Sequence, residues 1–159
     1  MASDRGFGVA SPDEIEGLSG IEMLQAMIDR RLPAPPMAET LGFRLIEVSP
    51  GLAVFEGSPG PHLLNPLGSV HGGYALTLID SAAGCALHTE LSAGTGYTTV
   101  ETKVNFTRPI PTDGGPIRCE GRLLSRGRQI ATAEARLASA EGKLLAHGGS
   151  TLIILPARH

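Results

Sequence analysis

The chain has 159 residues, of which 42% are hydrophobic and 18% charged, and its formal net charge is −3. This length fits one domain with a substantial hydrophobic core. The 16 acidic residues outnumber the 13 basic ones, which argues against general nucleic-acid binding, because such binding favours a basic face. Only 4% of the residues are aromatic and none is Trp, so few side chains are available to stack on single-stranded bases.

Two segments precede the predicted core. Residues 1–17 are polar and lack periodicity, so we expect a flexible N-terminal arm. In residues 18–36, Ile21, Leu24 and Ile28 recur at helical spacing, and three prolines end the pattern. This pattern predicts a covering helix and a Pro-rich connection, and whether the helix acts as a lid stays open. No basic segment followed by an apolar run opens the chain, so we expect no signal peptide and a cytoplasmic protein.

Residues 37–159 are predicted to form a single domain. Six segments alternate apolar and polar residues between turn residues and are predicted strands: 41–48, 52–57, 97–107, 117–125, 129–138 and 143–155. An apolar run of helix length, residues 74–87, lies between the second strand and the third. Because this helix is apolar nearly all round, an antiparallel sheet has to curl around it. The predicted fold class is therefore α+β, and a second copy is expected on the side that the sheet leaves open.

One carboxylate, Asp80, interrupts the apolar helix. Burying its charge costs several kcal/mol unless a neighbour pairs or uses it. No Lys or Arg lies between Arg44 and Lys103, so the sequence offers no nearby cation. A carboxyl group desolvated by apolar neighbours is a competent general base near neutral pH. We therefore predict that Asp80 is catalytic rather than structural. The same residue and the glycines around it interrupt the apolar run, which is then too short to span a membrane, so we expect no membrane partner.

The loop before the helix carries four more candidates: Asn65, His71, Gly72 and Gly73. The glycines let a ligand approach the backbone, and free N–H groups at a helix start are suited to an oxyanion. Each residue also has an ordinary structural explanation. An Asn before Pro is a common turn pair, and a His or a Gly pair is common where a helix begins.

The chain resembles the hotdog-fold acyl-CoA thioesterases in three features. These are the order of its strands and helix, the spacing Asn-x5-His-Gly-Gly-x7-Asp, and the segment Val104-Asn-Phe-x-Arg-Pro109. The resemblance is to their phenylacetyl-CoA (PaaI-like) group, within the 4-hydroxybenzoyl-CoA thioesterase superfamily, and covers about residues 36–155. It implies that Asp80 is the general base or nucleophile and that the Gly72 N–H polarises the thioester carbonyl. It further implies that Asn65 positions water or the carboxylate and that His71 organises the loop.

Geometry adds a constraint on these roles. Eight residues of helix separate Gly72 from Asp80 by about 12 Å, which is too far for both to act on one carbonyl carbon. If both are catalytic, they come from different subunits. We therefore expect a homodimer with two sites at its interface, and pairing of such dimers into a homotetramer.

The remaining candidates would contact the substrate. The resemblance points to the turn Ser125-Arg126-Gly127-Arg128 for the phosphates of CoA, with Arg108 as a further cation, since Arg pairs well with phosphate. The alternative is that these are solvated strand ends. Relatives carry a small hydroxyl residue near Glu101, where this chain has a carboxylate between Thr99 and Thr102. Thr99, Glu101 and Gly73 are thus all candidates for the substrate side.

The resulting prediction is the hydrolysis of an acyl-CoA, aryl-acyl or medium-chain fatty acyl, to free acid and CoA. We expect no separate cofactor, since CoA is part of the substrate, and no metal, since His62, His88 and His147 share no ligand spacing with Asp or Cys. Cys85 and Cys119 are expected to be buried free thiols. Two alternatives stay open: an acyl-thioester hydratase or dehydratase, and a non-catalytic acyl-CoA sensor.

Overall fold

The structure is a computed structural model that describes residues 5–157. Its helices are α1 (Pro12–Ile15), α2 (Gly20–Ile28), α3 (Pro36–Leu41) and α4 (Gly72–His88), with a 3-10 turn at Pro61–Leu63. Its strands are β1 (Phe43–Ser49), β2 (Leu52–Gly57), β3 (Gly96–Phe106), β4 (Ile117–Arg126), β5 (Ile130–Ala138) and β6 (Leu144–Leu155). The predicted succession of two strands, one long helix and four strands is confirmed.

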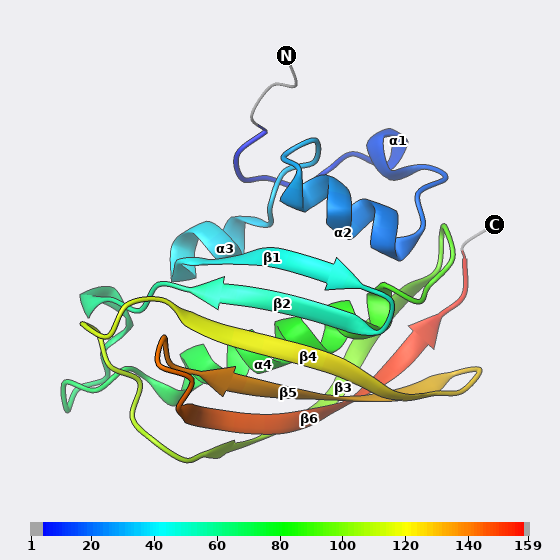
Figure 1. The fold of residues 1–159 in the computed structure, drawn as a ribbon. Helices are drawn as coiled ribbons and strands as arrows, with labels where there is room; N and C mark the ends of the chain where they lie inside the picture. Colours follow the sequence, from blue (N-terminus) through cyan, green and yellow to red (C-terminus); the bar gives the residue numbers. More distant parts are fainter. Residues whose placement is uncertain (1–4, 158–159) are drawn as a thin grey trace.

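The six strands form one antiparallel sheet in the order β1-β2-β4-β5-β6-β3. Figure 1 shows the strands curving across α4, with α1 and α2 beyond the β1 edge. Strand β3 forms the opposite edge of the sheet. The predicted α+β class, an antiparallel sheet around a central helix, is confirmed, and none of the helices in residues 5–157 has the length and apolarity needed to cross a membrane.

Small residues let α4 approach the sheet closely. Gly121 of β4 lies where a Cβ would collide with the carbonyl oxygen of Ala82. This close approach leaves Leu78, Ile79 and Leu87 with no exposed surface. The sheet covers only one side of α4, however. Its other side carries a stripe of partly exposed residues at helical spacing, which we call the open stripe: Gly73, Leu76, Thr77, Asp80, Ser81, Cys85 and His88.

The chain before β1 has more regular structure than its composition indicates. Within the arm expected at residues 1–17, helix α1 is capped by Ser11 and Glu14, and Phe7 pairs with Ala34 in a parallel bridge. Residues 1–4 of that arm lie outside the described residues. The covering helix predicted in residues 18–36 is α2, which Ser19 and Glu22 cap reciprocally.

The strand predicted at 41–48 begins later than expected. Leu41 is the last residue of α3, and Gly42 ends that helix in the left-handed conformation with φ of 69°. Prolines at the start of α3 also fit the first helical turn, where a missing N–H costs little. The predicted Pro-rich connection thus contains a short helix, and β1 starts at Phe43.

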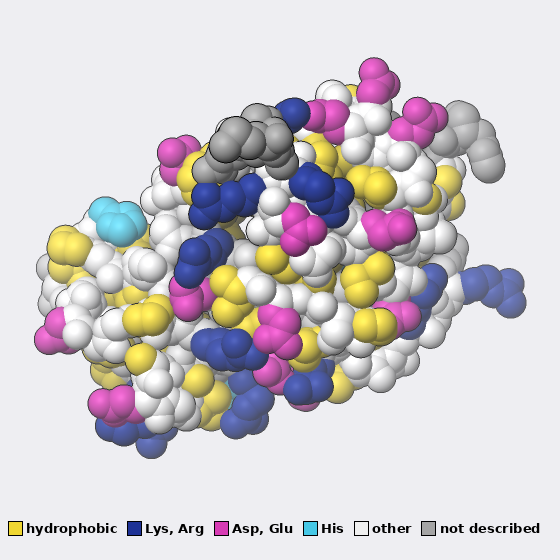
Figure 2. Space-filling view, turned by 45° about the horizontal axis from the view of Figure 1, so that its top comes forward, with side chains coloured by type: hydrophobic (Ala, Val, Ile, Leu, Met, Phe, Trp, Pro, Cys, Tyr) yellow, Lys and Arg dark blue, Asp and Glu magenta, His cyan; other side chains and the backbone are white. Residues whose placement is uncertain are grey.

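Basic and acidic side chains are interspersed on the face shown in Figure 2. Exposed ion pairs join Arg44 of β1 to Glu56 of β2, and Arg122 to Glu120 along β4. Such exposed pairs contribute little to stability. The packing of α4 on the sheet, rather than surface charge, therefore holds the fold.

We expect Leu78→Ala to lower the free energy of unfolding by about 3 kcal/mol, because it leaves a cavity between α4 and the sheet. Leu124→Ala is the matched control, since Leu124 is 60% exposed, and it should change stability by less than about 0.5 kcal/mol. Denaturant titration of both variants measures the difference. Equal effects of the two substitutions would contradict this account of the core.

Candidate functional site

The Asp80 carboxylate is held by hydroxyl groups. The hydroxyls of Thr99 and Thr102 both donate to Asp80 Oδ1, at 2.8 Å and 3.0 Å. The Thr102 hydroxyl also lies 2.9 Å from the hydroxyl of Ser150, which is 4% exposed. No residue among 5–157 donates to Oδ2 or forms an ion pair with Asp80. One carboxylate oxygen is thus fixed by neutral donors, while the other has no hydrogen-bond donor among the described residues.

A β-bulge makes this arrangement possible. In a regular strand Thr99 and Thr102 would point to opposite faces, because side chains alternate. The pairing of β3 with β6 shifts between Thr99 and Glu101, so that Val100 is an extra residue. The shift turns both threonine hydroxyls toward α4. Glu101 is exposed and alternates with Thr102, so its side chain points away from Asp80.

At the start of α4, two of the first three backbone amides have acceptors within the chain and one has none among the described residues. His71 is the N-cap, and its Nδ1 accepts the Gly73 N–H at 2.8 Å. The Tyr74 N–H donates to the His71 carbonyl at 3.0 Å. The Gly72 N–H has no acceptor among the described residues. Gly72 is also the place where the Phe106 ring comes close, since a Cβ there would lie 3.0 Å from the ring. The helix start therefore leaves one amide available for a ligand.

The Asn65 side chain stabilises the loop that leads to this helix start. Its Oδ1 accepts the N–H groups of Leu67 and Ser69, at 2.9 Å and 3.1 Å. This is the turn geometry that its position before Pro66 favours. The side-chain NH2 group has no partner among residues 5–157 and remains a possible donor.

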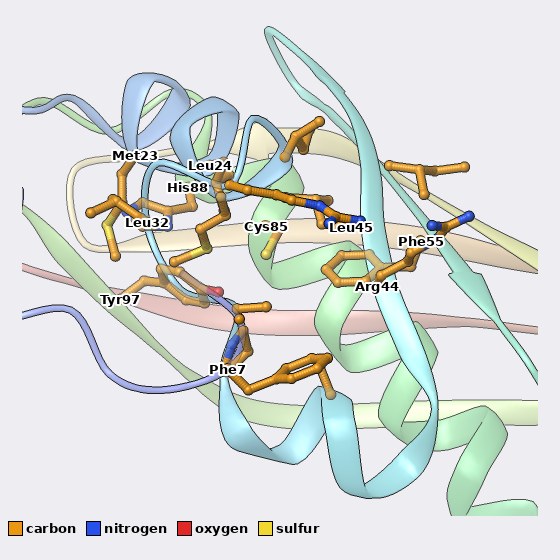
Figure 3. A pocket seen from close by; sticks show the side chains of 18 residues that line it. Phe7, Met23, Leu24, Leu32, Arg44, Leu45, Phe55, Cys85, His88 and Tyr97 are labelled. Carbon is orange, nitrogen blue, oxygen red and sulfur yellow. The ribbon is translucent and has the colours of Figure 1, made fainter. Parts of the chain in front are cut away.

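A cavity of about 620 Å³ lies between α2, β1 and α4. Figure 3 shows its labelled side chains, which include Phe7 and Met23 from the N-terminal segment, Leu45 from β1, and Cys85 and His88 from α4. Burial lowers the pKa of His88, so its imidazole is neutral at neutral pH. A second, more open cavity of about 310 Å³ lies beside His71 at the start of α4.

The basic residues predicted to bind the CoA phosphates do not lie close together within one chain. Arg108 follows the end of β3 near the start of α4 and donates to the Leu144 carbonyl at 3.0 Å. The turn Ser125-Arg126-Gly127-Arg128 is exposed, and Arg126 donates to the Glu90 carbonyl at 2.5 Å, just beyond the end of α4. Arg108 and this turn thus lie at opposite ends of the central helix.

Thr99 was predicted from the sequence as a site residue, whereas Thr102 and Ser150 were not. Thr102 was missed because a β-bulge turns it to the same side as Thr99. The bulge arises where β3 pairs with β6, and the alternation of side chains along the sequence of β3 does not reveal it. The cavity side chains Cys85 and Tyr97 were not predicted as site residues either. The Cys85 thiol and the Tyr97 hydroxyl form a hydrogen bond with each other, and burial, together with the nearby Asp80 charge, raises the pKa of both groups. Their proximity arises from the packing of β3 on α4.

Comparison with known proteins identifies relatives of this chain. A family model described as the thioesterase superfamily matches residues 67–146. Human acyl-coenzyme A thioesterase 13 is 29% identical over 133 residues, which cover 82% of this chain and 93% of the human protein. These matched regions include the start of α4, Asp80 and the threonines that hold it.

Solved structures share the fold. A phenylacetic acid degradation-related protein of Ralstonia eutropha JMP134 is 27% identical, with a TM-score of 0.74, and the match covers 82% of this chain and 98% of that one. The PaaI protein of E. coli has a TM-score of 0.68 at 21% identity, covering 76% and 85% of the two chains. The hotdog fold and the resemblance to the PaaI-like group are confirmed.

We expect neither thiol of the native protein to react with a disulfide reagent at pH 8. Desolvation raises the pKa of Cys85 and of Cys119 to about 12, so only about one thiol in 10⁴ is ionised at that pH. Ellman's reagent should label both thiols in guanidinium chloride and neither in the native state. Rapid labelling of one thiol in the native protein would contradict the raised pKa of that thiol.

Proposed function

Because this chain belongs to the thioesterase superfamily, its chemistry is thioester hydrolysis, and we propose that its substrate is an acyl-CoA, which it converts to free acid and CoA. One observation carries the proposal most directly: Asp80 is fixed through Oδ1 by two hydroxyls while Oδ2 has no partner among residues 5–157. A carboxylate held in this way has a defined orientation and one oxygen left for chemistry. The likeness to human acyl-coenzyme A thioesterase 13 supports CoA esters as the substrate class.

Asp80 Oδ2 would act on the thioester carbonyl in one of two ways. As a general base it takes a proton from water, and the resulting hydroxide attacks the carbonyl carbon. As a nucleophile it attacks that carbon itself and forms an anhydride, which water then opens. In both routes the carbonyl oxygen becomes an oxyanion, the C–S bond breaks and the CoA thiolate takes up a proton. An unpaired backbone N–H facing that oxygen stabilises the transition state, and Gly72 has such a group.

The two groups would meet across a homodimer. Within one helix they are about 12 Å apart, so Asp80 of one copy would work with Gly72 of the other. Two features of the single chain support a second copy. The open stripe of α4 includes Leu76, which is 40% exposed, and the edge strand β3 exposes Val100 and Phe106 by 57% and 60%. Unpaired strand edges and exposed apolar side chains favour association. A homotetramer would form by pairing such dimers.

Contacts to CoA are part of the proposal. Arg128 has no side-chain partner among residues 5–157, whereas Arg126 is engaged by the Glu90 carbonyl. In the exposed turn at 125–128, Arg128 is therefore the better cation for a phosphate group. Arg108 would serve at the opposite end of α4, where the partner copy contributes its own residues.

The geometry disfavours a hydratase or dehydratase with His71 as base. Because Nδ1 accepts the Gly73 N–H, the neutral ring carries its proton on Nε2. Neither nitrogen then has a free lone pair with which to take a proton. His71 instead positions the helix start. The remaining alternative, a non-catalytic acyl-CoA sensor, predicts binding without turnover, and the following substitutions test it.

We expect Asp80→Asn to lower kcat at least 10²-fold, because the amide cannot accept a proton at the position of Oδ2. The fold should be kept, since the amide oxygen can still accept the two threonine hydroxyls. Asp113→Asn in an exposed loop is the matched control and should leave kcat unchanged. Release of CoA thiol from an acyl-CoA panel measures the rates. Full activity of Asp80→Asn would rule out the mechanism, and an inactive wild type that binds acyl-CoA would favour the sensor.

We expect Gly72→Pro to lower kcat/KM about 10²–10³-fold. Gly72 is the first residue of α4, where Pro fits the helix; the substitution removes the N–H and adds a Cβ beside the Phe106 ring. The preceding His71 has φ of −63° and ψ of 135°, which suits a residue before Pro. Gly72→Ala is the matched control, since its Cβ meets the same Phe106 ring but the N–H remains. Equal losses in the two variants would show that crowding, not the amide, limits activity.

Mixing the two inactive variants tests the shared site. A heterodimer of Asp80→Asn and Gly72→Pro subunits contains one site with both lesions and one with none. Random re-assortment of equal amounts should therefore restore about a quarter of the wild-type activity. No recovery after confirmed subunit exchange would contradict a site built from two chains.

A further inference from the structure

We propose that the cavity beneath α2 holds the acyl group of the substrate, and that it selects a straight aliphatic chain over an aryl group. This inference rests on the proposed acyl-CoA hydrolysis and names the acyl class that the same site accepts. In this proposal, α2 and the segment around Phe7 help to determine which acyl groups the protein accepts.

The position of the cavity connects it to Asp80. Tyr97 lines the cavity and stands two residues before Thr99, on the same face of β3. Gly84 follows Asp80 by one helical turn, and a Cβ there would lie 2.7 Å from the Tyr97 hydroxyl. Cys85, the next residue, lines the cavity itself. The cavity therefore begins one turn of α4 from the carboxylate, further along the open stripe.

The lining offers an acyl group mostly apolar contacts, although it includes His88, whose ring nitrogens have no hydrogen-bond partner among residues 5–157. Helix α2 contributes Met23, Met27 and Ile28. Among the described residues no fully buried side-chain nitrogen or oxygen lacks a hydrogen bond. The two arginines at the cavity, Arg30 and Arg44, have interaction partners of their own. A mostly apolar site desolvates a hydroxyl or amide on its ligand at a cost, and it offers few groups that could offset that cost.

The size of the cavity decides between the two acyl classes. A cavity of about 150 Å³ is enough to hold benzene, whereas this one has about 620 Å³. An aryl-acetyl group would leave most of that space unfilled and forgo contacts with the lining. A flexible chain of eight to ten carbons fills more of it, and the methionines of α2 can adapt to its shape. Each further buried methylene should raise kcat/KM about fourfold until the cavity is full.

A series of substrates tests this selection. We expect kcat/KM to rise from butanoyl- through hexanoyl- and octanoyl- to decanoyl-CoA, and to be at least tenfold lower for phenylacetyl-CoA than for decanoyl-CoA. CoA thiol release measures each value. A flat series, or phenylacetyl-CoA as the best substrate, would overturn the inference while leaving the proposed hydrolysis intact.

A variant pair locates the effect in the cavity. Met27→Trp should fill part of the space and lower kcat/KM for decanoyl-CoA at least tenfold, with less than twofold change for butanoyl-CoA. Gln25→Trp on the exposed side of α2 is the matched control and should keep the wild-type chain-length profile. Met23→Phe is a milder second variant in case Met27→Trp folds poorly. Unchanged profiles in folded cavity variants would overturn the proposal.

Binding separates this proposal from the proposed reaction. Calorimetry of decanoic acid with the wild-type protein should show binding that Met27→Trp weakens at least tenfold and Gln25→Trp does not. If no acyl-CoA is hydrolysed, the proposed function fails, yet this measurement still reports on the cavity. If hydrolysis occurs and decanoic acid binds equally to all three proteins, the cavity is not the acyl site.

Discussion

The two threonine hydroxyls on Asp80 Oδ1 are the contacts on which the candidate site depends. A carboxylate among apolar residues needs donors, and a cation would have neutralised its charge. Neutral hydroxyls orient the group and leave its charge available for chemistry. The arrangement requires the bulge at Val100, because a regular strand would turn one hydroxyl away. A backbone irregularity at the sheet edge therefore sets the geometry of a helix residue.

The open stripe of α4 combines three tasks along one helix face. Its first part, around Leu76, is left uncovered by the sheet and suits a second copy of the chain. Its middle carries Asp80. Its last part, at Cys85 and His88, is covered by α2 and encloses the larger cavity. The order along the helix matches the order of a thioester substrate, with the reacting carbonyl near the carboxylate and the acyl group beyond it.

The start of α4 shows how one capping residue decides which backbone amides are paired within the chain. His71 uses its ring nitrogen for the Gly73 N–H and its carbonyl for the Tyr74 N–H. The Gly72 N–H is the first amide of the helix and remains unpaired among the described residues. Because a helix start concentrates partial positive charge, that amide is well placed for a developing oxyanion. Loop contacts from Asn65 hold this start in place.

The sequence by itself determined the six strands, the central helix and the singular position of Asp80, because periodicity and an isolated charge are local properties. It placed the start of β1 wrongly, since Gly42 ends a short helix that the prolines obscured. Only the tertiary structure decided that Thr102 and Ser150 join Thr99, that Arg108 lies far from the 125–128 turn, and that α2 encloses a cavity. These features depend on strand register and on packing between segments distant in the chain, which no local pattern encodes.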